Sequence, residues 1–451
     1  EGYADICDAE TTKAFLDYTF DRYQGAFGED FGKTLGGVFT DEASYCIAGP
    51  YGQSYSPIAW SHGFGEEFLR RYGYDITTQL VSLFEQVGEW RKVRLDYWRL
   101  LTDLLSINYY KQYAERCDEL GIQLTGHVSG EEHFRWQLLM YGDPWLTLKW
   151  MHQPGIDSIF PRMNHDADYF MTAAKMGSAV LRYSGRERLL CETYTGSGWE
   201  LTPADMKLIC DKLVLGGVNL IQYMGAYYSV AGMRKVLLTG YPPSHSFQQA
   251  WWPYYHLFGD YVGRLCHTLV ATKPTAKIGL VYPTSTAYVE WQGTAADLWG
   301  GAVSPERLER FQLVFHALTN VLLELGFDYE YLFEEVFAQG QVVEGVLKVV
   351  NAEFDTLIVP AATALPAEVA RRLAEFATAG GQVVFVNYLP EWADGDSAAL
   401  ALVEALTGQT GEAANAEVDA RINAGSGTEI KENGKVTWLV SSDIAVENRQ
   451  P

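Results

Sequence analysis

Cysteine is scarce in this sequence and never stands in a metal-binding or disulfide pattern. No two of the six cysteines form a C-x-x-C pair; they are Cys7, Cys46, Cys117, Cys191, Cys210 and Cys266. Structural zinc sites and disulfide frameworks need cysteines at close and regular spacing. We therefore expect reduced, partly buried thiols, and neither a zinc site nor a disulfide framework.

Positive charge is also in short supply. The chain has 34 lysines and arginines against 57 aspartates and glutamates, a formal net charge of −23 at pH 7. Such a chain repels phosphate backbones, and it has no basic stripe that would bind them. We expect no nucleic-acid partner and no membrane partner. No apolar run reaches the roughly 20 residues that span a bilayer, so we expect a soluble chain.

An initiator methionine and a signal peptide are both missing. The chain opens with Glu1, Gly2 and Tyr3 and enters a helical pattern almost at once. This favours a start from which upstream sequence has been removed, and a leader would have gone with it. The compartment is therefore left open between periplasmic, secreted and cytoplasmic.

The composition of what remains is that of a folded protein. Hydrophobic residues make up 48% and charged residues 20% of 451 residues, which predicts two or three units with separate cores. Aromatic residues reach 14%, with 28 tyrosines and 13 tryptophans. Their flat rings suit stacking on sugars, although large cores also hold many rings.

Short apolar strands alternate with helical stretches in the first part of the chain. The expected strands are 36–42, 122–125, 155–159, 188–192 and 217–223. Repeated strand and helix units predict a parallel sheet. We expect a (β/α)8 TIM-type barrel, and because five strands do not close it, three units would precede Glu1. An open α/β sheet is the alternative.

A second α/β unit is expected after a change of character near Ala271 to Pro274. Strands at 277–282, 356–360 and 382–386 alternate with helices at 305–325 and 367–379, which is typical of a flavodoxin-like domain. We divide the chain into a barrel portion at 1–270, an α/β domain at 271–415 and the start of a truncated β-rich segment at 416–451.

Two glutamates stand where a barrel enzyme keeps its catalytic groups. Glu42 ends the apolar run Val38 to Thr40, and Glu192 ends Leu189 to Cys191, so both fall at the C-terminal tips of expected strands. Glycoside hydrolysis needs one carboxylic acid and a second carboxylate across the sugar. We predict this pair to be catalytic; the alternative is that each caps a helix or pairs with an arginine.

Neighbouring polar residues are candidates for substrate or cation binding. Glu131 lies with Glu132 and His127 in an acidic rim cluster that would bind a cation, hold sugar hydroxyls or supply the second carboxylate; solvated loop charge is the alternative. Asp41 has the same ambiguity, and His127 is a candidate substrate contact.

Sugar-contacting side chains are also expected near the later strands. The candidates for stacking or hydrogen bonding, several of which would equally serve as core residues, are Tyr194, Trp199, Asn219, Tyr223, Trp251 and Trp252.

Nucleotide and thiol chemistry are not supported. The stretch Gly28 to Thr34 has three residues between its glycines instead of the four of a phosphate loop, and it joins helix to strand. The later α/β unit has no G-x-G-x-x-G after its first strand. It has no cysteine after Cys266, so it cannot use a thiol nucleophile as class I amidotransferases of similar layout do.

The order of motifs resembles the barrel of the large bacterial α-L-rhamnosidase-like glycoside hydrolases. The resemblance covers roughly residues 1–270 and is carried by motifs in this order: 37–42 (GVFTDE), 125–127 (TGH) with Glu131, 142–144 (GDP), 154–157 (PGID), 191–192 (CE) with Gly198 and Trp199, 217–219 (GVN), 228–229 (YS), 242–244 (PPS) and 251–252 (WW).

This resemblance implies a glycoside hydrolase with two catalytic acids, at Glu42 and Glu192 with Glu131 in reserve, that inverts the sugar carbon. It implies no cofactor for the chemistry itself and calcium as a candidate ion near the substrate, with Glu131 as a candidate ligand. The later domain is similar to the amidotransferase-like trimerisation domain of family 42 β-galactosidases, which implies a homo-oligomer.

The function we expect is release of a terminal sugar from an oligo- or polysaccharide. An α-L-rhamnoside is the first choice of substrate and a β-galactoside the second. The alternative from another class is a catalytically silent carbohydrate-binding or scaffold protein, in which the acids only hold a cation or hydroxyls.

Overall fold

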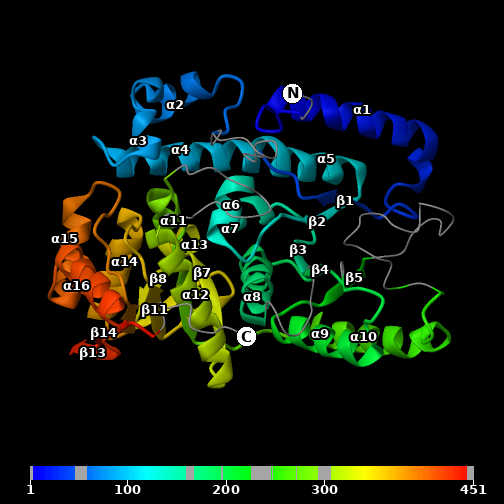
Figure 1. Ribbon diagram of the computed structural model, residues 1–451. Coiled ribbons are helices and arrows are strands. Elements are labelled where there is room, and N and C mark those ends of the chain that lie inside the picture. The colour runs from blue at the N-terminus through cyan, green and yellow to red at the C-terminus, as the bar shows by residue number, and fades with distance from the viewer. Residues whose placement is uncertain are drawn as a thin grey trace.

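The computed structural model describes residues 4–45, 58–158, 167–194, 197–224, 245, 247–270, 272–292 and 306–443 (Figure 1). It is a mixed α/β structure. The parallel strands of the first part and the larger sheet of the second part stand apart, with helices between them and around them.

Five short parallel strands form the framework of the first part. They are β1 (Gly37–Asp41), β2 (Gln123–His127), β3 (Gly155–Ser158), β4 (Leu190–Thr193) and β5 (Leu220–Tyr223). β1 pairs with β2, and β3, β4 and β5 pair in that order. A parallel bridge from Thr125 to Gln153 joins the two sets. The strands therefore follow one another in chain order, as in part of a (β/α) barrel.

β1, β2 and β3 approach one another closely because glycines stand between them. Gly126 has φ +141, and a Cβ there would lie 1.9 Å from the Thr40 carbonyl oxygen. A Cβ on Gly155 would lie 2.2 Å from the carbonyl oxygen of Gly126. Since only glycine fits such spaces, both residues are needed for the strands to align their C-terminal ends.

Helices surround these strands in the order of the chain. They are α1 (Ala9–Phe27), α2 (Phe64–Tyr72), α3 (Val81–Phe84), α4 (Trp90–Leu105), α5 (Gln112–Leu120), α6 (Phe134–Met140), α7 (Pro144–Leu148), α8 (Ala167–Ser184), α9 (Pro203–Leu215) and α10 (Tyr255–Val270), with short helical turns at Gly28–Asp30, Ile76–Thr78 and Trp252–Tyr254. A π-helical segment, Ser106–Lys111, joins α4 to α5 into one long rod across the molecule (Figure 1).

Sequence signals set several helix ends. Asp8 caps α1 by accepting a hydrogen bond from the Thr11 amide. Thr202 and Asp205 form a reciprocal capping box at the start of α9, where Pro203 takes the first helical position. The starts of these two helices are therefore explained by local chemistry.

The second part is built on a six-stranded sheet, in the order β13, β14, β12, β11, β6, β7. The strands are β6 (Ile278–Tyr282), β7 (Tyr329–Phe333), β11 (Thr356–Pro360), β12 (Gln382–Val386), β13 (Thr428–Asn433) and β14 (Val436–Ser441), and a small antiparallel sheet holds β8 (Gln341–Val343), β9 (Val346–Val349) and β10 (Ala352–Phe354). The helices are α11 (Thr284–Glu290), α12 (Glu306–Glu324), α13 (Glu334–Gln339), α14 (Ala367–Thr378), α15 (Ser397–Thr407) and α16 (Gly411–Ala424).

The expectation of a separate β-rich segment from residue 416 is corrected by this sheet. β14 pairs in parallel with β12, and β13 pairs antiparallel with β14 at the sheet edge. Helix α16 runs across the expected boundary at 415. The described residues after 415 belong to the second α/β unit because their strands extend its sheet.

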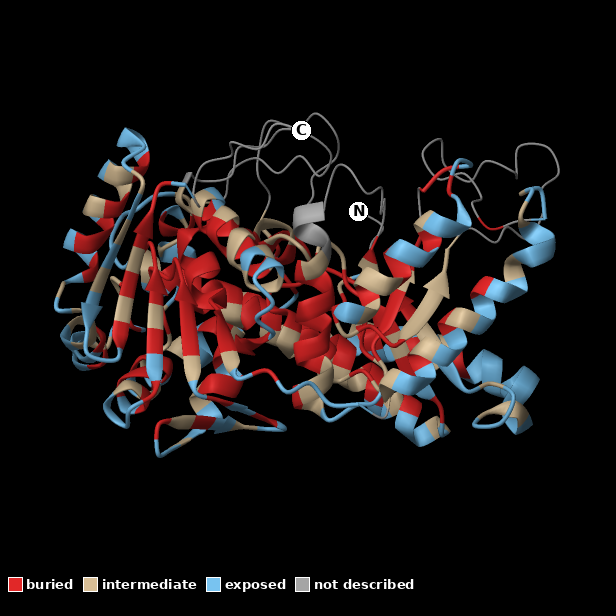
Figure 2. Ribbon diagram, turned by 90° about the horizontal axis from the view of Figure 1, so that it is seen from below, coloured by how far each residue is buried: buried red, intermediate tan, exposed pale blue. Residues whose placement is uncertain are grey.

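Buried residues form one connected core through both parts (Figure 2). Arg94 of α4, fully buried, donates to the carbonyl oxygen of Val289 at 2.9 Å. Gln137 of α6 donates to the hydroxyl of Tyr282 on β6 at 2.6 Å. These contacts fix the first part against the second through side chains shielded from water.

Each of the five described cysteines is buried and free of a disulfide within the described residues, and Cys46 lies outside them. Within the described part of the chain, every helix is too short or too polar to serve as a membrane span.

Candidate active site

The C-terminal ends of β1, β2 and β4 bring the predicted acids together. β1 ends at Asp41 and Glu42 follows it with φ 52, a left-handed conformation that is uncommon for glutamate. Asp41 is paired in register with His127 of β2. Glu192 lies one residue before the end of β4. The parallel sheet therefore delivers these side chains to one edge, as predicted for Glu42 and Glu192.

His127 is the hub of the cluster. Its Nδ1 donates to the Val128 carbonyl oxygen at 3.0 Å, and its Nε2 lies 3.2 Å from Glu192 Oε2 and 3.4 Å from Asp41 Oδ1. Both ring nitrogens thus face acceptors, which the imidazolium form satisfies. Glu42, Asp41 and His127 each have one polar atom within 4.8 Å of the others.

Electrostatics support a charged His127. Burial alone lowers the pKa of His127, but the hydrogen bond to Glu192 and the nearby Glu131 and Asp157 outweigh it and raise the pKa to about 10. The imidazole is therefore a cation at neutral pH. It is a candidate for holding the acids in place rather than for exchanging protons.

Glu42 has the environment of a proton donor. Its side chain is exposed to solvent, yet partial loss of its hydration raises its pKa. The negative charges of Asp41 and Glu192 raise this pKa further, whereas the His127 cation and a hydrogen bond from Ser129 lower it. A carboxyl with a raised pKa stays protonated closer to neutral pH, as a general acid requires.

Asp157 is a site residue that the sequence reasoning missed. It lies on β3 in register with Glu192 of β4, and its Oδ1 is buried without a hydrogen-bond partner. Burial raises the pKa of Asp157 to about 8; His127 opposes the rise, and Glu192 and Glu42 add to it. The signal that marked Glu42, an acid at the end of a buried strand, was also present here.

Glu131 is not a solvated loop charge. It is buried, its Oε1 accepts a hydrogen bond from the Asp157 amide at 2.9 Å, and burial holds its pKa well above the usual range. Because Glu131 is buried and bonded to the Asp157 amide, it is better placed to support the site than to contact a sugar directly.

The donor set does not fit a resident calcium ion. Calcium takes six to eight oxygen ligands. Among the described residues, Asp41, Glu42 and His127 form the one group of such side chains with ligand atoms within 4.8 Å of one another, and it offers two carboxylates and a ring nitrogen where calcium prefers oxygen. Glu131 already bonds to the Asp157 amide.

The predicted sugar contacts divide into two groups. Trp199 and Trp252 are exposed, by 43% and 39%, and so are available for stacking. Tyr223 is half-buried at the end of β5, next to Thr193 of β4. Trp251 connects the segment before α10 to the segment before α9, since its Nε1 donates to the Leu201 carbonyl oxygen at 3.2 Å.

Tyr194 and Asn219 are corrected as substrate contacts. Tyr194 is fully buried, stacks on Tyr223 with ring centroids 5.7 Å apart, and donates its hydroxyl to the Met206 carbonyl oxygen. Asn219 precedes β5, so it lies at the opposite end of the strand from the acids. Its amide group bonds to the Leu189 amide and the Glu187 carbonyl oxygen. Both are structural residues.

Two of the motifs in the resemblance, at 228–229 and 242–244, fall outside the described part of the chain. The other motifs lie on or beside the five strands and their loops.

Comparison with solved structures shows the same fold. A rhamnosidase from Novosphingobium sp. PP1Y is 19% identical with a TM-score of 0.63; the match covers 98% of this chain and 38% of that one. A family 42 β-galactosidase from G. stearothermophilus is 14% identical with a TM-score of 0.57 and covers 86% of this chain and 56% of that one.

Sequence comparison points the same way. A curated protein of Formosa agariphila, provisionally named a beta-glucuronidase, is 21% identical over 359 residues, which are 78% of this chain and 27% of that protein. The chain thus spans well under half of the curated relative and of the rhamnosidase. A family model described as alpha-L-rhamnosidase matches residues 2–298. The chain belongs to this family of glycoside hydrolases, family 106.

Proposed function

We propose that this chain carries the catalytic edge of a glycoside hydrolase that releases a terminal neutral sugar, with an α-L-rhamnoside as the first choice of substrate. The observation that supports this most is the gathering of Glu42, Asp41 and Glu192 around one buried imidazolium at the C-terminal ends of β1, β2 and β4. Hydrolysis of a glycosidic bond needs two carboxyl groups in different protonation states on either side of that bond.

The two acids have different roles in this proposal. Glu42, whose pKa is raised mainly by partial loss of hydration, donates its proton to the leaving oxygen. Glu192, facing the His127 cation at 3.2 Å, acts as the carboxylate that activates water for attack on the anomeric carbon. The water oxygen bonds to that carbon, the glycosidic bond breaks, and Glu192 takes the proton of the water. His127 is a positioning residue.

The charge of the site favours a neutral sugar over a uronic acid. Two carboxylates, Asp41 and Glu192, already face the one His127 cation, and the Glu42 and Asp157 carboxyl groups beside them have raised pKa values. A uronate would bring a further negative charge into this group, which like-charge repulsion disfavours. A rhamnoside or a galactoside has no such penalty.

A panel of aryl glycosides tests the proposal. The chain, in its complete natural polypeptide, should release the aryl group from the α-L-rhamnoside faster than from the β-galactoside and the β-glucuronide. On an alkyl glycoside of the preferred sugar, whose leaving group needs a proton, Glu42→Gln and Glu192→Gln should each lower kcat by at least about 1,000-fold. Glu29→Gln, an exposed acid in the helical turn before β1, should leave kcat unchanged.

Two other results would replace the proposal. Faster turnover of the β-galactoside would favour the second substrate, the one in the name of the family 42 structure. Tight oligosaccharide binding by calorimetry with no turnover on any aryl glycoside would favour the silent carbohydrate-binding alternative. A homo-oligomer formed through the second α/β unit is part of the proposal and is tested by light scattering.

A further inference from the structure

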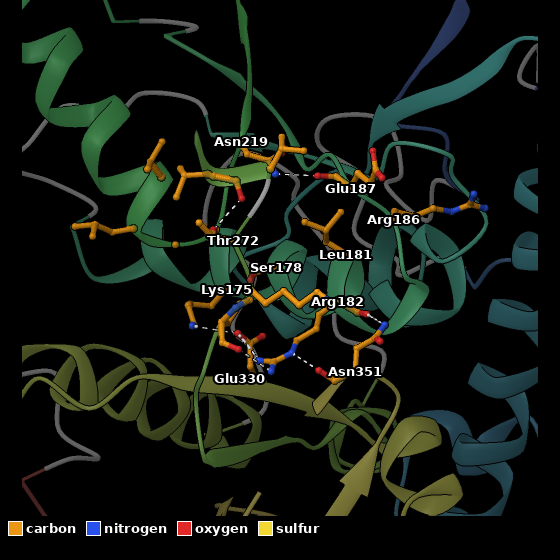
Figure 3. A pocket seen from close by; sticks show the side chains of 18 of the residues that line it. Lys175, Ser178, Leu181, Arg182, Arg186, Glu187, Asn219, Thr272, Glu330 and Asn351 are labelled. Carbon is orange, nitrogen blue, oxygen red and sulfur yellow. Dashed lines mark hydrogen bonds and ion pairs between the residues drawn. The ribbon is translucent and has the colours of Figure 1, made fainter. Parts of the chain in front are cut away.

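The two ends of the parallel strands are held by different parts of the molecule. At the N-terminal ends of β4 and β5 lies a cavity of about 540 Å³ that α8 and β7 both line (Figure 3). There Lys175 of α8 pairs with Asp328 at 3.0 Å, and Arg182 pairs with Glu330 of β7 at 3.5 Å. These ion pairs join the first part to the second at the end of the strands away from the acids.

At the other end, the end of β1 meets the π-helical segment Ser106–Lys111. The Gln112 amide bonds to the Ile107 carbonyl oxygen, five residues earlier instead of the four of an α-helix. Such a wider turn spaces successive side chains by a smaller angle around the helix axis. Two successive tyrosines of this segment, Tyr109 and Tyr110, both reach the end of β1. Single π-helical turns inside longer helices often occur at functional sites.

The two tyrosine hydroxyls hold the chain on either side of Glu42. The Tyr109 hydroxyl shares a hydrogen bond with Thr40 Oγ1 at 2.9 Å, two residues before Glu42. The Tyr110 hydroxyl donates to the Ala43 carbonyl oxygen at 2.9 Å, one residue after Glu42. Both tyrosines are buried, so water competes little for these hydrogen bonds.

The backbone of Glu42 needs such support. Its φ of 52 lies in the left-handed region, which is unfavourable for a residue that carries a side chain. A residue keeps such a conformation only where the surrounding structure holds it there. A Glu42 that relaxed to a negative φ would turn its carboxyl group away from Asp41 and His127, which now lie within 4.8 Å of it.

We propose that Tyr109 and Tyr110 are positioning residues that hold Glu42 in its left-handed conformation, so that its carboxyl group faces the leaving oxygen of the substrate. The π-helical turn supplies both hydroxyls from successive residues. The kinetic consequence rests on the proposed role of Glu42 as general acid, whereas the structural consequence does not.

Crystal structures test the effect on Glu42 without an assay. Tyr109→Phe, Tyr110→Phe and the double variant are made in the full chain, and each change removes one hydroxyl group. The unchanged protein should keep the Glu42 φ near 52. In the double variant we expect a negative φ at Glu42 and a carboxyl group that has left His127. A double variant in which Glu42 keeps its φ near 52 would overturn the proposal.

Kinetics separate positioning from folding. An alkyl glycoside of the preferred sugar needs a proton on its leaving group, and a dinitrophenyl glycoside does not. Loss of folded protein lowers both rates alike, whereas a misplaced Glu42 lowers the alkyl rate alone. We expect each single variant to lower kcat on the alkyl glycoside about tenfold. The double variant should lower it about 100-fold, the loss that a misplacement of about 1 Å causes. KM and the dinitrophenyl rate should stay within about twofold in all three variants.

Two matched changes complete the design. Tyr113 is buried in the same rod and meets Phe20 and Tyr109 through its ring, so Tyr113→Phe should keep the alkyl rate. Thr40→Val removes the other half of the Tyr109 hydrogen bond. Thr40→Val combined with Tyr109→Phe should therefore lose no more activity than either change alone, because both remove one and the same bond.

Two kinetic results would also overturn the proposal. One is an equal loss on both glycosides in Tyr109→Phe and Tyr110→Phe, which would mean an effect on folding. The other is a loss on the alkyl glycoside no larger than that of Tyr113→Phe. Should the unchanged chain turn over neither glycoside, the proposed function fails, and the crystal structures still decide whether the two tyrosines hold Glu42.

Discussion

His127 and Glu192 meet at 3.2 Å across the ends of β2 and β4, and this contact joins a buried imidazolium to a predicted catalytic carboxylate. The same Nε2 atom lies 3.4 Å from Asp41 on β1. Because three strands contribute to one cluster, the site exists only when the parallel strands are in the observed register.

Replacing His127 should change both the rate and its pH dependence. His127→Gln removes the cation that lowers the pKa of Glu42, so that pKa should rise. A general acid loses activity as the pH rises through its pKa, so the alkaline limb of kcat/KM should move to higher pH. The value of kcat/KM at neutral pH should fall about tenfold to a hundredfold. The exposed His256→Gln should change neither. An unmoved alkaline limb in His127→Gln would contradict this account.

Removing the ring of Trp252 should affect substrate binding more than chemistry. Trp252 is 39% exposed and stacks on Tyr255 with centroids 5.2 Å apart, so its free face is held for stacking. Trp252→Ala should raise KM for an oligosaccharide about two- to tenfold with kcat little changed. Tyr254→Ala, two positions away and 67% exposed, is the control. Equal KM values for the two variants would show that Trp252 does not contact the substrate.

Gly126 should tolerate no side chain. Gly126→Ala would place a Cβ 1.9 Å from the Thr40 carbonyl oxygen at φ +141, so β1 and β2 would have to separate. The expected loss in the free energy of unfolding is at least about 3 kcal/mol, measured by urea denaturation. Gly36→Ala, where nothing lies within 4 Å, is the matched control. Similar midpoints for both variants would mean that the strands pack less tightly than described.

Stability should fall as the pH rises from 6.5 to 9. The folded-state pKa of His127, about 10, lies above its unfolded value near 6.5, so its contribution is full below that value and is lost as the pH rises through the folded value. Asp157 and Glu334, with pKa raised to about 8 mainly by burial, hold protons that the unfolded chain has already released. Both kinds of group therefore lower the free energy of unfolding as the pH rises.

Urea midpoints at pH 6.5 and pH 9 measure this effect, which we expect to exceed about 1 kcal/mol. Three buried histidines with lowered pKa values, His133, His245 and His316, are neutral in the folded chain but half protonated at pH 6.5 in the unfolded chain, so they oppose this fall by about 0.4 kcal/mol each. Asp157→Asn should reduce the slope, whereas the exposed Asp260→Asn should not. A higher midpoint at pH 9 than at pH 6.5 would be incompatible with these shifts.

The positions of Glu42 and Glu192 could be predicted because a short-range pattern determines them. Where short apolar runs alternate with helices, each run is expected to form a strand of a parallel sheet. An acid at the end of such a run then lies at the sheet edge. The same holds for α9, whose ends follow from Thr202, Pro203 and Gly216. Local signals sufficed wherever the neighbouring residues decide the conformation.

The errors came from features that distant residues decide. Tyr194 follows β4 directly, but its φ of 71 turns the chain so that the ring enters the core. Asn219 fell inside the strand expected at 217–223, but β5 begins after it. β14 joins the sheet beside β12, about 50 residues earlier in the chain, and a pairing of that range leaves no local pattern. β7 is buried at all five positions and so lacks the alternation that marks a strand.

The dependence of rate on the leaving group tests most directly whether Glu42 is the general acid. Glu42→Gln and Glu192→Gln are each assayed with a dinitrophenyl glycoside, whose leaving group needs no proton, and with an alkyl glycoside, whose leaving group does. We predict that Glu42→Gln loses at least about 100-fold more activity on the alkyl substrate than on the dinitrophenyl one, while Glu192→Gln loses both activities alike. Equal losses on both substrates in Glu42→Gln would contradict the assignment.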